Sequence, residues 1–307
     1  MAHNVFIDGG AGTTGLEIAE RLAPRPEFSM LVLAEDERKQ ESARRAALNA
    51  ADFAILCLPD DAARQAVALA EGSGVRIIDA SSAHRVAPGW TYGFPEVVGS
   101  EAVANAARVS NPGCYPTGFI ALLAPLVRAR LLPADWPYTC NAVSGYSGGG
   151  KALIARFEDE ADIAYRTYGL GFGHKHVPEM QAHAGLDLPP VFAPSVVPAF
   201  RGMVVEIPLP LAAIPGAAAP DALREELARF YTDSNIVSVQ VDQLDELLLR
   251  AKAPASDRLD LFVFGSADGT QARLVAVLDN LGKGASGAAV QNLNLMAGLP
   301  QEAGLSL

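Results

Sequence analysis

The N-terminal segment IDGGAGTTGLEIAERL constrains the fold of this chain more than any other part of the sequence. It has the spacing G-x-G-x-x-G between a short apolar run, 5–7, and an amphipathic helical pattern over 14–22. Glycines at this spacing let the backbone turn tightly and approach a pyrophosphate, whose charge the N–H groups at the helix start can bind. A lone glycine triplet is a weak signal, but the strand-turn-helix context favours a dinucleotide site over a plain tight turn. We expect the dinucleotide to contact Gly10, Gly12, Thr13, Thr14 and Gly15.

Apolar runs and helical patterns alternate through the first third of the chain. The runs MLVLA (30–34), FAILCL (53–58) and VRIID (75–79) are continuous, as in parallel strands that are buried on both faces. Segments rich in Ala, Arg and Glu lie between them, at 38–49 and 60–72. This alternation predicts βαβ units and an α/β fold with a doubly wound (Rossmann) parallel sheet.

The pattern changes after the cysteine at position 114, where strands cluster with fewer helices between them and predict a second, α+β domain. These expected strands lie at 203–209, 236–241, 259–264 and 274–278. We predict a dinucleotide-binding domain over 1–113, a catalytic and dimerisation domain over 114–283, and a C-terminal helix over 284–307 that returns to the first domain.

Composition limits the class of protein. The 307 residues carry a net charge of -11, which argues against a general binder of nucleic acids or anionic membranes. The three cysteines are widely spaced and indicate neither a disulfide framework nor a CxxC metal site. The N-terminus lacks the pattern of a signal peptide, and the apolar runs are too short to span a membrane, so we expect a soluble cytoplasmic protein.

The segment RVSNPGCYPTGFIALLAPLV predicts a strand, a turn and a helix, with Cys114 at the turn. A helix N-terminus favours the thiolate over the thiol, so Cys114 is the candidate nucleophile. Cys57 and Cys140 lie inside apolar strand patterns, where a cysteine is typically a packing residue.

A cysteine nucleophile needs a proton shuttle, and the segment GHKHVPEM offers His174 and His176. At alternate positions of an extended segment the two rings would face one side, with Glu179 available to orient one of them. Metal binding by this HxH pair is the rival interpretation, but no further ligand set at metal-site spacing accompanies it, so we expect no metal. We favour His176 as general acid/base and His174 in a substrate-binding or orienting role, and the reverse assignment stays open.

The choice of dinucleotide is open on these grounds. Glu35 lies where an acid would hold a ribose 2′-hydroxyl and favour NAD. Arg38 and Lys39 follow at once and could instead accept a 2′-phosphate.

Together, SNPGCYPTG, DASSAHR, GFPEV, VSGYSGGGK, GHKHVPEM and GKGASGAAVQNLNLM resemble the N-acetyl-γ-glutamyl-phosphate reductases in their shorter form. The resemblance covers essentially the whole chain, and the cysteine motif is its most specific part. Leu122 departs from the family signature, which usually has a smaller residue there. The resemblance implies reduction of an acyl phosphate to a semialdehyde in arginine biosynthesis, through a Cys114 thioester, with NADPH as cofactor.

This chemistry requires groups that hold anions. We expect Arg85, Lys151 and Arg201 as cations for the phosphate or carboxylate, together with Ser144 in the glycine-rich segment. Solvated surface positions are the alternative for each cation. For the cofactor, we expect further contacts with Arg38, Ser81, Ser82, Asn280 and Gly284, and Asn280 could instead cap a helix.

Three rival functions share part of this pattern. A reductase of aspartyl or amino-adipyl phosphate would use the same cofactor loop and cysteine. A cofactor-sensing regulator would leave the cysteine and histidine motifs unused, and a cysteine amidohydrolase would not need a dinucleotide. Assembly into a dimer or tetramer is expected for such an enzyme.

Overall fold

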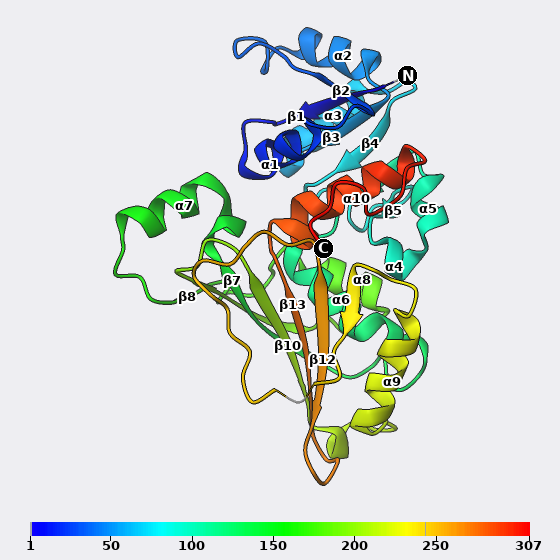
Figure 1. Cartoon of the computed structure of the whole chain (residues 1–307), viewed down its shortest axis with the longest axis vertical. Coiled ribbons are helices and arrows are strands. Elements are labelled where there is room, and N and C mark those ends of the chain that lie inside the picture. The colour runs from blue at the N-terminus through cyan, green and yellow to red at the C-terminus, as the bar shows by residue number, and fades with distance from the viewer. Residues whose placement is uncertain (1, 243) are drawn as a thin grey trace. The chain divides into compact units, whose positions relative to one another are not determined.

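A computed structural model describes residues 2–242 and 244–307 of the chain (Figure 1). It divides into two compact units. Unit 1 comprises Met1–Gly113 and Ala285–Leu305, and unit 2 comprises Cys114–Gly284 and Ser306–Leu307. The chain therefore passes from unit 1 to unit 2 at the candidate nucleophile and returns within the glycine-rich GKGASG segment.

Unit 1 is built around a six-stranded sheet in the order β2-β1-β3-β4-β6-β5. All strand pairs in it are parallel, which confirms the expected doubly wound fold. The strands are β1 (His3–Asp8), β2 (Phe28–Leu31), β3 (Phe53–Leu56), β4 (Arg76–Asp79), β5 (Thr91–Tyr92) and β6 (Arg108–Ser110). The helices are α1 (Thr13–Leu22), α2 (Glu41–Ala50), α3 (Asp60–Leu69), α4 (Pro95–Val98), α5 (Ser100–Ala104) and α10 (Gly287–Met296).

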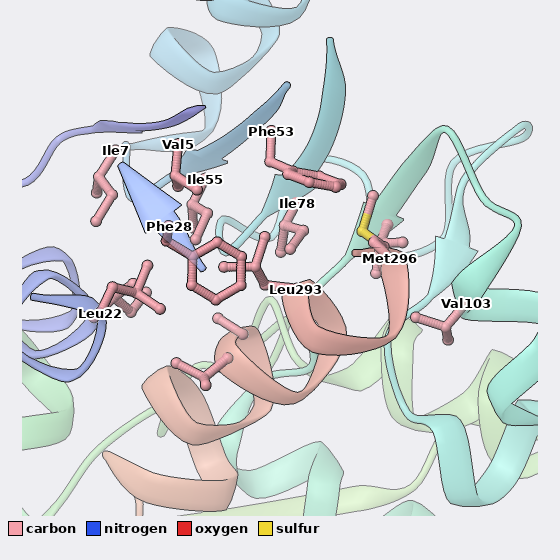
Figure 2. Close-up of a cluster of buried hydrophobic side chains, with 14 residues drawn as sticks. Val5, Ile7, Leu22, Phe28, Phe53, Ile55, Ile78, Val103, Leu293 and Met296 are labelled. Atoms are coloured by element: carbon pink, nitrogen blue, oxygen red, sulfur yellow. The ribbon is translucent and has the colours of Figure 1, made fainter. Parts of the chain in front are cut away.

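Alternate residues of these strands enter two different hydrophobic cores. On one face, Val5 and Ile55 pack with residues of α1, α5 and α10 (Figure 2). On the other face, Phe6 and Leu56 pack with residues of α2 and α3. Because both faces are covered, consecutive residues in the middle of these strands are apolar, which explains the continuous runs in the sequence.

Unit 2 contains a mixed seven-stranded sheet in the order β11-β12-β13-β10-β7-β9-β8. Its strands are β7 (Thr139–Gly145), β8 (Arg166–Thr167), β9 (Val191–Val197), β10 (Met203–Leu209), β11 (Val237–Val239), β12 (Leu259–Gly265) and β13 (Ala272–Leu278). Its helices are α6 (Cys114–Arg128), α7 (Gly150–Asp159), α8 (Val177–Ala184) and α9 (Pro220–Phe230), with short helical turns η1 (Tyr146–Gly149), η2 (Leu211–Ala213) and the π-helical η3 (Gly282–Ser286).

Helix α6 is the central helix of unit 2 and is apolar on almost every side. It packs on β10, β12 and β13 and is flanked by α8 and α9 (Figure 1). A helix that is hydrophobic all round is a buried helix, and the first residue of α6 is Cys114.

Several elements begin or end at other residues than the sequence predicts. The second strand is Phe28–Leu31 instead of 30–34, because Val32 lies beyond the last paired residue and is exposed. The second helix begins at Glu41 instead of residue 38, since the preceding residues form turns. The pairing partner, which local sequence does not specify, decides where each strand stops.

Candidate functional site

The glycine loop between β1 and α1 has the shape of a phosphate cradle. Gly12 is the N-cap of α1, and its N–H donates to the carbonyl of Gly9 (3.0 Å). A Cβ at Gly15 would lie 2.7 Å from that same carbonyl oxygen and 2.8 Å from the Cα of Gly10, so only glycine allows the helix to pack on the loop. Thr13 and the residues after it present the first N–H groups of α1, which fits the pyrophosphate of a dinucleotide.

An ion pair next to this loop, between Asp8 and Arg44, was not predicted from the sequence. Asp8, the last residue of β1, accepts hydrogen bonds from Nε (2.9 Å) and Nη2 (2.7 Å) of Arg44 in α2. The Asp8 side chain is buried, with 6% of its surface exposed, and the Arg44 side chain is partly buried, with 11% exposed. Because a bare carboxylate here would repel a pyrophosphate, Arg44 makes the end of β1 compatible with an anionic ligand. Only the tertiary contact reveals this role.

The residues that would read the adenosine ribose lie in the segment between β2 and α2. Glu35, Arg38 and Lys39 are all exposed there. The N–H of Arg38 donates to the carbonyl of Ala34 (3.2 Å), which anchors the turn and leaves the guanidinium at the surface. An acid for a ribose 2′-hydroxyl and two cations for a 2′-phosphate are therefore all exposed in this segment. The contact of Arg38 with the cofactor stays a prediction.

The two serines expected to contact the cofactor already bind carboxylates of unit 1. Ser81 donates its N–H (2.9 Å) and its hydroxyl (2.8 Å) to Asp79 at the end of β4. Ser82 donates its N–H (3.0 Å) and its hydroxyl to Asp60, the first residue of α3. These bonds shape the turn after β4, and the predicted cofactor contacts of both serines stay predictions.

Arg85, the first candidate for the phosphate, is buried. Its Nε donates to the carbonyl of Asn111 (3.0 Å), and its Nη2 donates to that of Ala80 (3.2 Å). These bonds join the turn after β4 to the segment just before Cys114. The guanidinium of Arg85 thus holds main-chain carbonyls together, and this favours a structural role over the predicted contact with substrate.

Cys114 begins α6 and is partly exposed, which combines access with the favourable dipole of a helix N-terminus. The other two thiols lie in a different environment. Burial, followed by the nearby carboxylates of Asp79 and Asp8, raises the pKa of Cys57 to about 12. Cys140 is completely buried, and this burial raises its pKa well above the ordinary value. Of the three cysteines, Cys114 has the environment of a nucleophile.

The histidine pair lies in a turn, so the expectation of an extended segment was wrong. His176 has helical backbone angles and is the N-cap of α8, because Pro178 stands in the first turn of that helix, where proline is favoured. The turn still brings the rings together, with centroids 4.8 Å apart. The N–H of His176 donates to Nδ1 of His174 (3.2 Å), while burial and then the charge of Lys175 lower the pKa of His174. Glu179 is buried in the first turn of α8, and its orienting role stays a prediction.

Two tyrosines connect the histidine pair to the start of α6. The ring of Tyr115 lies 5.9 Å from that of His176, and the ring of Tyr168 lies 5.7 Å from that of His174. Tyr115 donates its hydroxyl to the carbonyl of Ser195 in β9 (3.0 Å). Burial first, and then Tyr168 and Cys114, raise the pKa of Tyr115, and burial raises that of Tyr168 to about 12, so both phenols are neutral donors at physiological pH. The structure therefore brings the cysteine and histidine motifs into one neighbourhood of unit 2.

The three other residues expected to bind substrate anions, Arg201, Ser144 and Lys151, differ in their burial and in their partners. Arg201 pairs with Asp279 (2.9 Å), and its side chain is 15% exposed. Ser144 is buried and donates its hydroxyl to the carbonyl of Gly145 (2.9 Å). Lys151 is exposed in the first turn of α7. Their contacts with substrate stay predictions.

Residues 280–284 contain two expected cofactor ligands and one residue that the sequence analysis missed. The side chain of Asn280 accepts the N–H of Gly202 (2.9 Å) and donates to the hydroxyl of Ser147 (2.9 Å), so it ties loops together instead of capping a helix. Lys283 is only 2% exposed, which is unusual for lysine. The glycines on both sides of Lys283 were its only signal in the sequence. Gly284 packs against Cys114.

Neither a metal cluster nor a membrane-spanning helix is found in the described parts of the chain. In residues 2–242 and 244–307, no three His, Cys, Asp or Glu side chains are grouped as metal ligands. Across the same ranges, no helix has both the length and the apolar character that crossing a bilayer requires.

The sequence matches two family models. Residues 4–106 match the NAD binding domain of semialdehyde dehydrogenases, and residues 114–280 match the semialdehyde dehydrogenase dimerisation domain. Among similar curated proteins, the N-acetyl-gamma-glutamyl-phosphate reductase of Brucella ovis is 50% identical over 309 residues, covering 97% of this chain and 100% of the relative. N-acetyl-gamma-glutamyl-phosphate reductase 2 of Nostoc sp. is 48% identical over 318 residues, covering 98% of each chain.

Solved structures with a similar fold are more distant in sequence. Aspartate semialdehyde dehydrogenase II from Vibrio cholerae superimposes with a TM-score of 0.70 at 18% identity, covering 96% of this chain and 98% of that one. Aspartate semialdehyde dehydrogenase from Candida albicans, solved with NADP, gives a TM-score of 0.68 at 16% identity, with the same coverage. At this identity the likeness concerns the fold alone.

Proposed function

The chain belongs to the semialdehyde dehydrogenase family, and from this premise we propose that it reduces N-acetyl-γ-glutamyl phosphate to N-acetylglutamate 5-semialdehyde, a step of arginine biosynthesis. The observation that carries the proposal is the placement of Cys114 at the start of α6, beside the aromatic and histidine cluster, in a chain that is 50% identical to a reductase of that name over nearly its whole length. The cofactor is NADPH.

The nucleophilic step uses Cys114. Its Sγ attacks the acyl carbon, the new C–S bond forms, and the C–O bond to phosphate breaks, so that inorganic phosphate leaves and a thioester remains on the enzyme. N–H groups in the first turn of α6 are suited to stabilise the oxyanion of the tetrahedral intermediate, because they lie at the positively polarised end of the helix.

The histidines divide two tasks. His174 uses Nδ1 to accept the N–H of His176, so its neutral ring carries the proton on Nε2 and can donate a hydrogen bond to a substrate oxygen. The lowered pKa of His174 keeps it in this neutral form. His176 is then the general acid/base that takes the thiol proton of Cys114 and returns it when the thiolate is released.

When bound, NADPH would supply the hydride for reduction of the thioester to the aldehyde. The glycine loop and the first turn of α1 would hold its pyrophosphate, with Arg44 neutralising Asp8 nearby. Arg38 and Lys39 would take the 2′-phosphate that distinguishes NADPH from NADH, since both are exposed in the segment after β2.

Substrate anions require cations in a protein with a net charge of -11. Arg201 is the strongest candidate because its guanidinium is held by Asp279 near the GKGASG segment and remains partly exposed. Lys151 is a second cation for the phosphate, and Ser144 a neutral donor.

The reverse reaction tests this proposal. Purified enzyme is mixed with N-acetylglutamate 5-semialdehyde, phosphate and NADP, and the absorbance of the reduced nicotinamide is followed. We expect turnover that depends on phosphate and is faster with NADP than with NAD. Absence of reduction would overturn the reductase assignment, and faster turnover of aspartate semialdehyde or the amino-adipyl analogue would overturn the substrate.

Two catalytic variants sharpen the test. Cys114→Ser is expected to lose nearly all turnover while still binding NADPH, because a hydroxyl is far less ionised than a thiol. His176→Ala is expected to slow the reaction about 10²-fold or more, as for loss of general acid/base catalysis. A larger loss in His174→Ala would exchange the roles of the two histidines.

The match of residues 114–280 to a dimerisation domain supports self-association. We propose a homodimer or a tetramer of the dimeric unit in the cytoplasm, where the reducing environment would keep Cys114 as a thiol. Light scattering on the size-separated protein measures the assembly, and a monomer at micromolar concentration would contradict it.

A further inference from the structure

We propose that Gly284 is a positioning residue for the Cys114 thiol: the lack of a side chain at position 284 lets the η3 turn pack directly on the nucleophile and restrict the directions that its Sγ can take. This inference rests on the proposed role of Cys114 as nucleophile. It gives Gly284 a task other than the cofactor contact that the sequence suggests.

The contact between the two residues is very close. A Cβ built on Gly284 would lie 2.9 Å from the Cβ of Cys114 and 3.3 Å from its Cα. It would also lie 3.1 Å from the carbonyl oxygen of Asp279, to which the N–H of Gly284 donates (3.0 Å). A methyl group at this position therefore has no space unless the cysteine or the turn moves.

The turn itself is held too firmly to retreat. The carboxylate of Asp279 accepts hydrogen bonds from Arg201 (2.9 Å) and from the N–H of Leu281 (2.9 Å). At Gly282, a Cβ would lie 1.9 Å from the carbonyl oxygen of Ser256, so the start of η3 is pressed against a second segment. A π-helical turn of this kind is often found at functional sites.

Cys114 is the more movable partner because it is the first residue of α6 and lacks the preceding helical turn. A Cβ at position 284 would meet the Cα–Cβ bond of Cys114, so the glycine lies close beside this bond, and we expect its main chain to disfavour an Sγ rotamer that points at it. The thiol is thus directed away from η3 by packing alone, before any substrate binds.

Gly284→Ala tests the proposal, with Gly74→Ala as the matched control because a Cβ at Gly74 meets nothing within 4 Å. Three quantities are measured: the rate of Cys114 alkylation by iodoacetamide as a function of pH, kcat and KM of the reverse reaction, and Kd for NADP. For Gly284→Ala we expect an altered alkylation pH profile and a kcat lower by about 10- to 100-fold, the effect of a misplaced reacting atom, with Kd for NADP unchanged. Gly74→Ala should match the wild type in all three.

An unchanged alkylation profile would overturn the proposal, and if Kd for NADP rises at the same time, Gly284 is a cofactor residue instead. The alkylation measurement does not depend on the reaction catalysed, so it remains decisive even if the wild type fails to reduce NADP. If Gly284→Ala does not fold, the double variant Cys114→Gly, Gly284→Ala removes the shortest of these contacts, 2.9 Å to the Cβ of Cys114, and should fold with at least part of the lost stability recovered. Failure of that rescue would also overturn the proposal.

Discussion

Alkylation with iodoacetamide at pH 7 should modify Cys114 alone and abolish activity in parallel. Only thiolates react, and a cysteine with the reference pKa of about 8.5 is about 3% thiolate at this pH. With a pKa of about 12, Cys57 is only about 10⁻⁵ thiolate, so ionisation alone makes it roughly 3,000-fold slower. Cys140 is completely buried and slower still. Cys114 gains further from the N-terminus of α6.

The assay is a time course in which peptide mass spectrometry counts the adduct on each cysteine while the reverse reaction is measured in the same samples. We expect one adduct per chain on Cys114 and loss of activity with the same rate constant. Cys114→Ser is the control and should remain unlabelled in its native state. Labelling of Cys57 at a comparable rate, or full activity after Cys114 is modified, would refute the reasoning.

Three further predictions concern stability. Arg44→Met should destabilise the protein by about 3–5 kcal/mol in urea unfolding, because it leaves the Asp8 carboxylate buried without its partner, and Asp8→Asn in the same chain should recover most of the loss. The pKa of His174 is lower in the folded protein than in the unfolded chain, so as the pH falls the His174 ring is protonated first in the unfolded chain. The contribution of His174 to the free energy of unfolding should therefore be complete above about pH 6.5 and decrease below it. The melting temperature of His174→Gln should depend less on pH in that range. Tyr115→Phe should cost about 1–2 kcal/mol in urea unfolding, because the buried carbonyl of Ser195 loses its donor, and an unchanged midpoint would contradict this.

The fold class was predictable because its signals are local. The glycine loop stands between one strand and one helix, and each apolar run is a strand whose two faces are covered. The position of the candidate nucleophile was predictable for the same reason. A cysteine that follows Asn-Pro-Gly and precedes a long apolar run predicts the start of a helix, and α6 begins at Cys114.

The environment of the candidate site residues was not predictable, because it depends on partners far away in the chain. Arg85 was expected to bind an anion, with a solvated surface position as the alternative, yet it is buried against main-chain carbonyls. Arg44 gave no signal at all, since its partner Asp8 lies in another βαβ element. The two histidines were expected in an extended segment. Instead, helix α8 begins directly after His176, with Pro178 in its first turn.

By itself, the sequence determined the doubly wound fold, the family and the identity of the candidate nucleophile, because strand periodicity, a glycine loop and a helix start are encoded by neighbouring residues. The tertiary structure alone decided which charges are paired, which hydroxyls are already occupied, and that Gly284 packs on Cys114. The physical reason is that burial, desolvation and close packing depend on the distances between atoms of residues that are far apart along the chain.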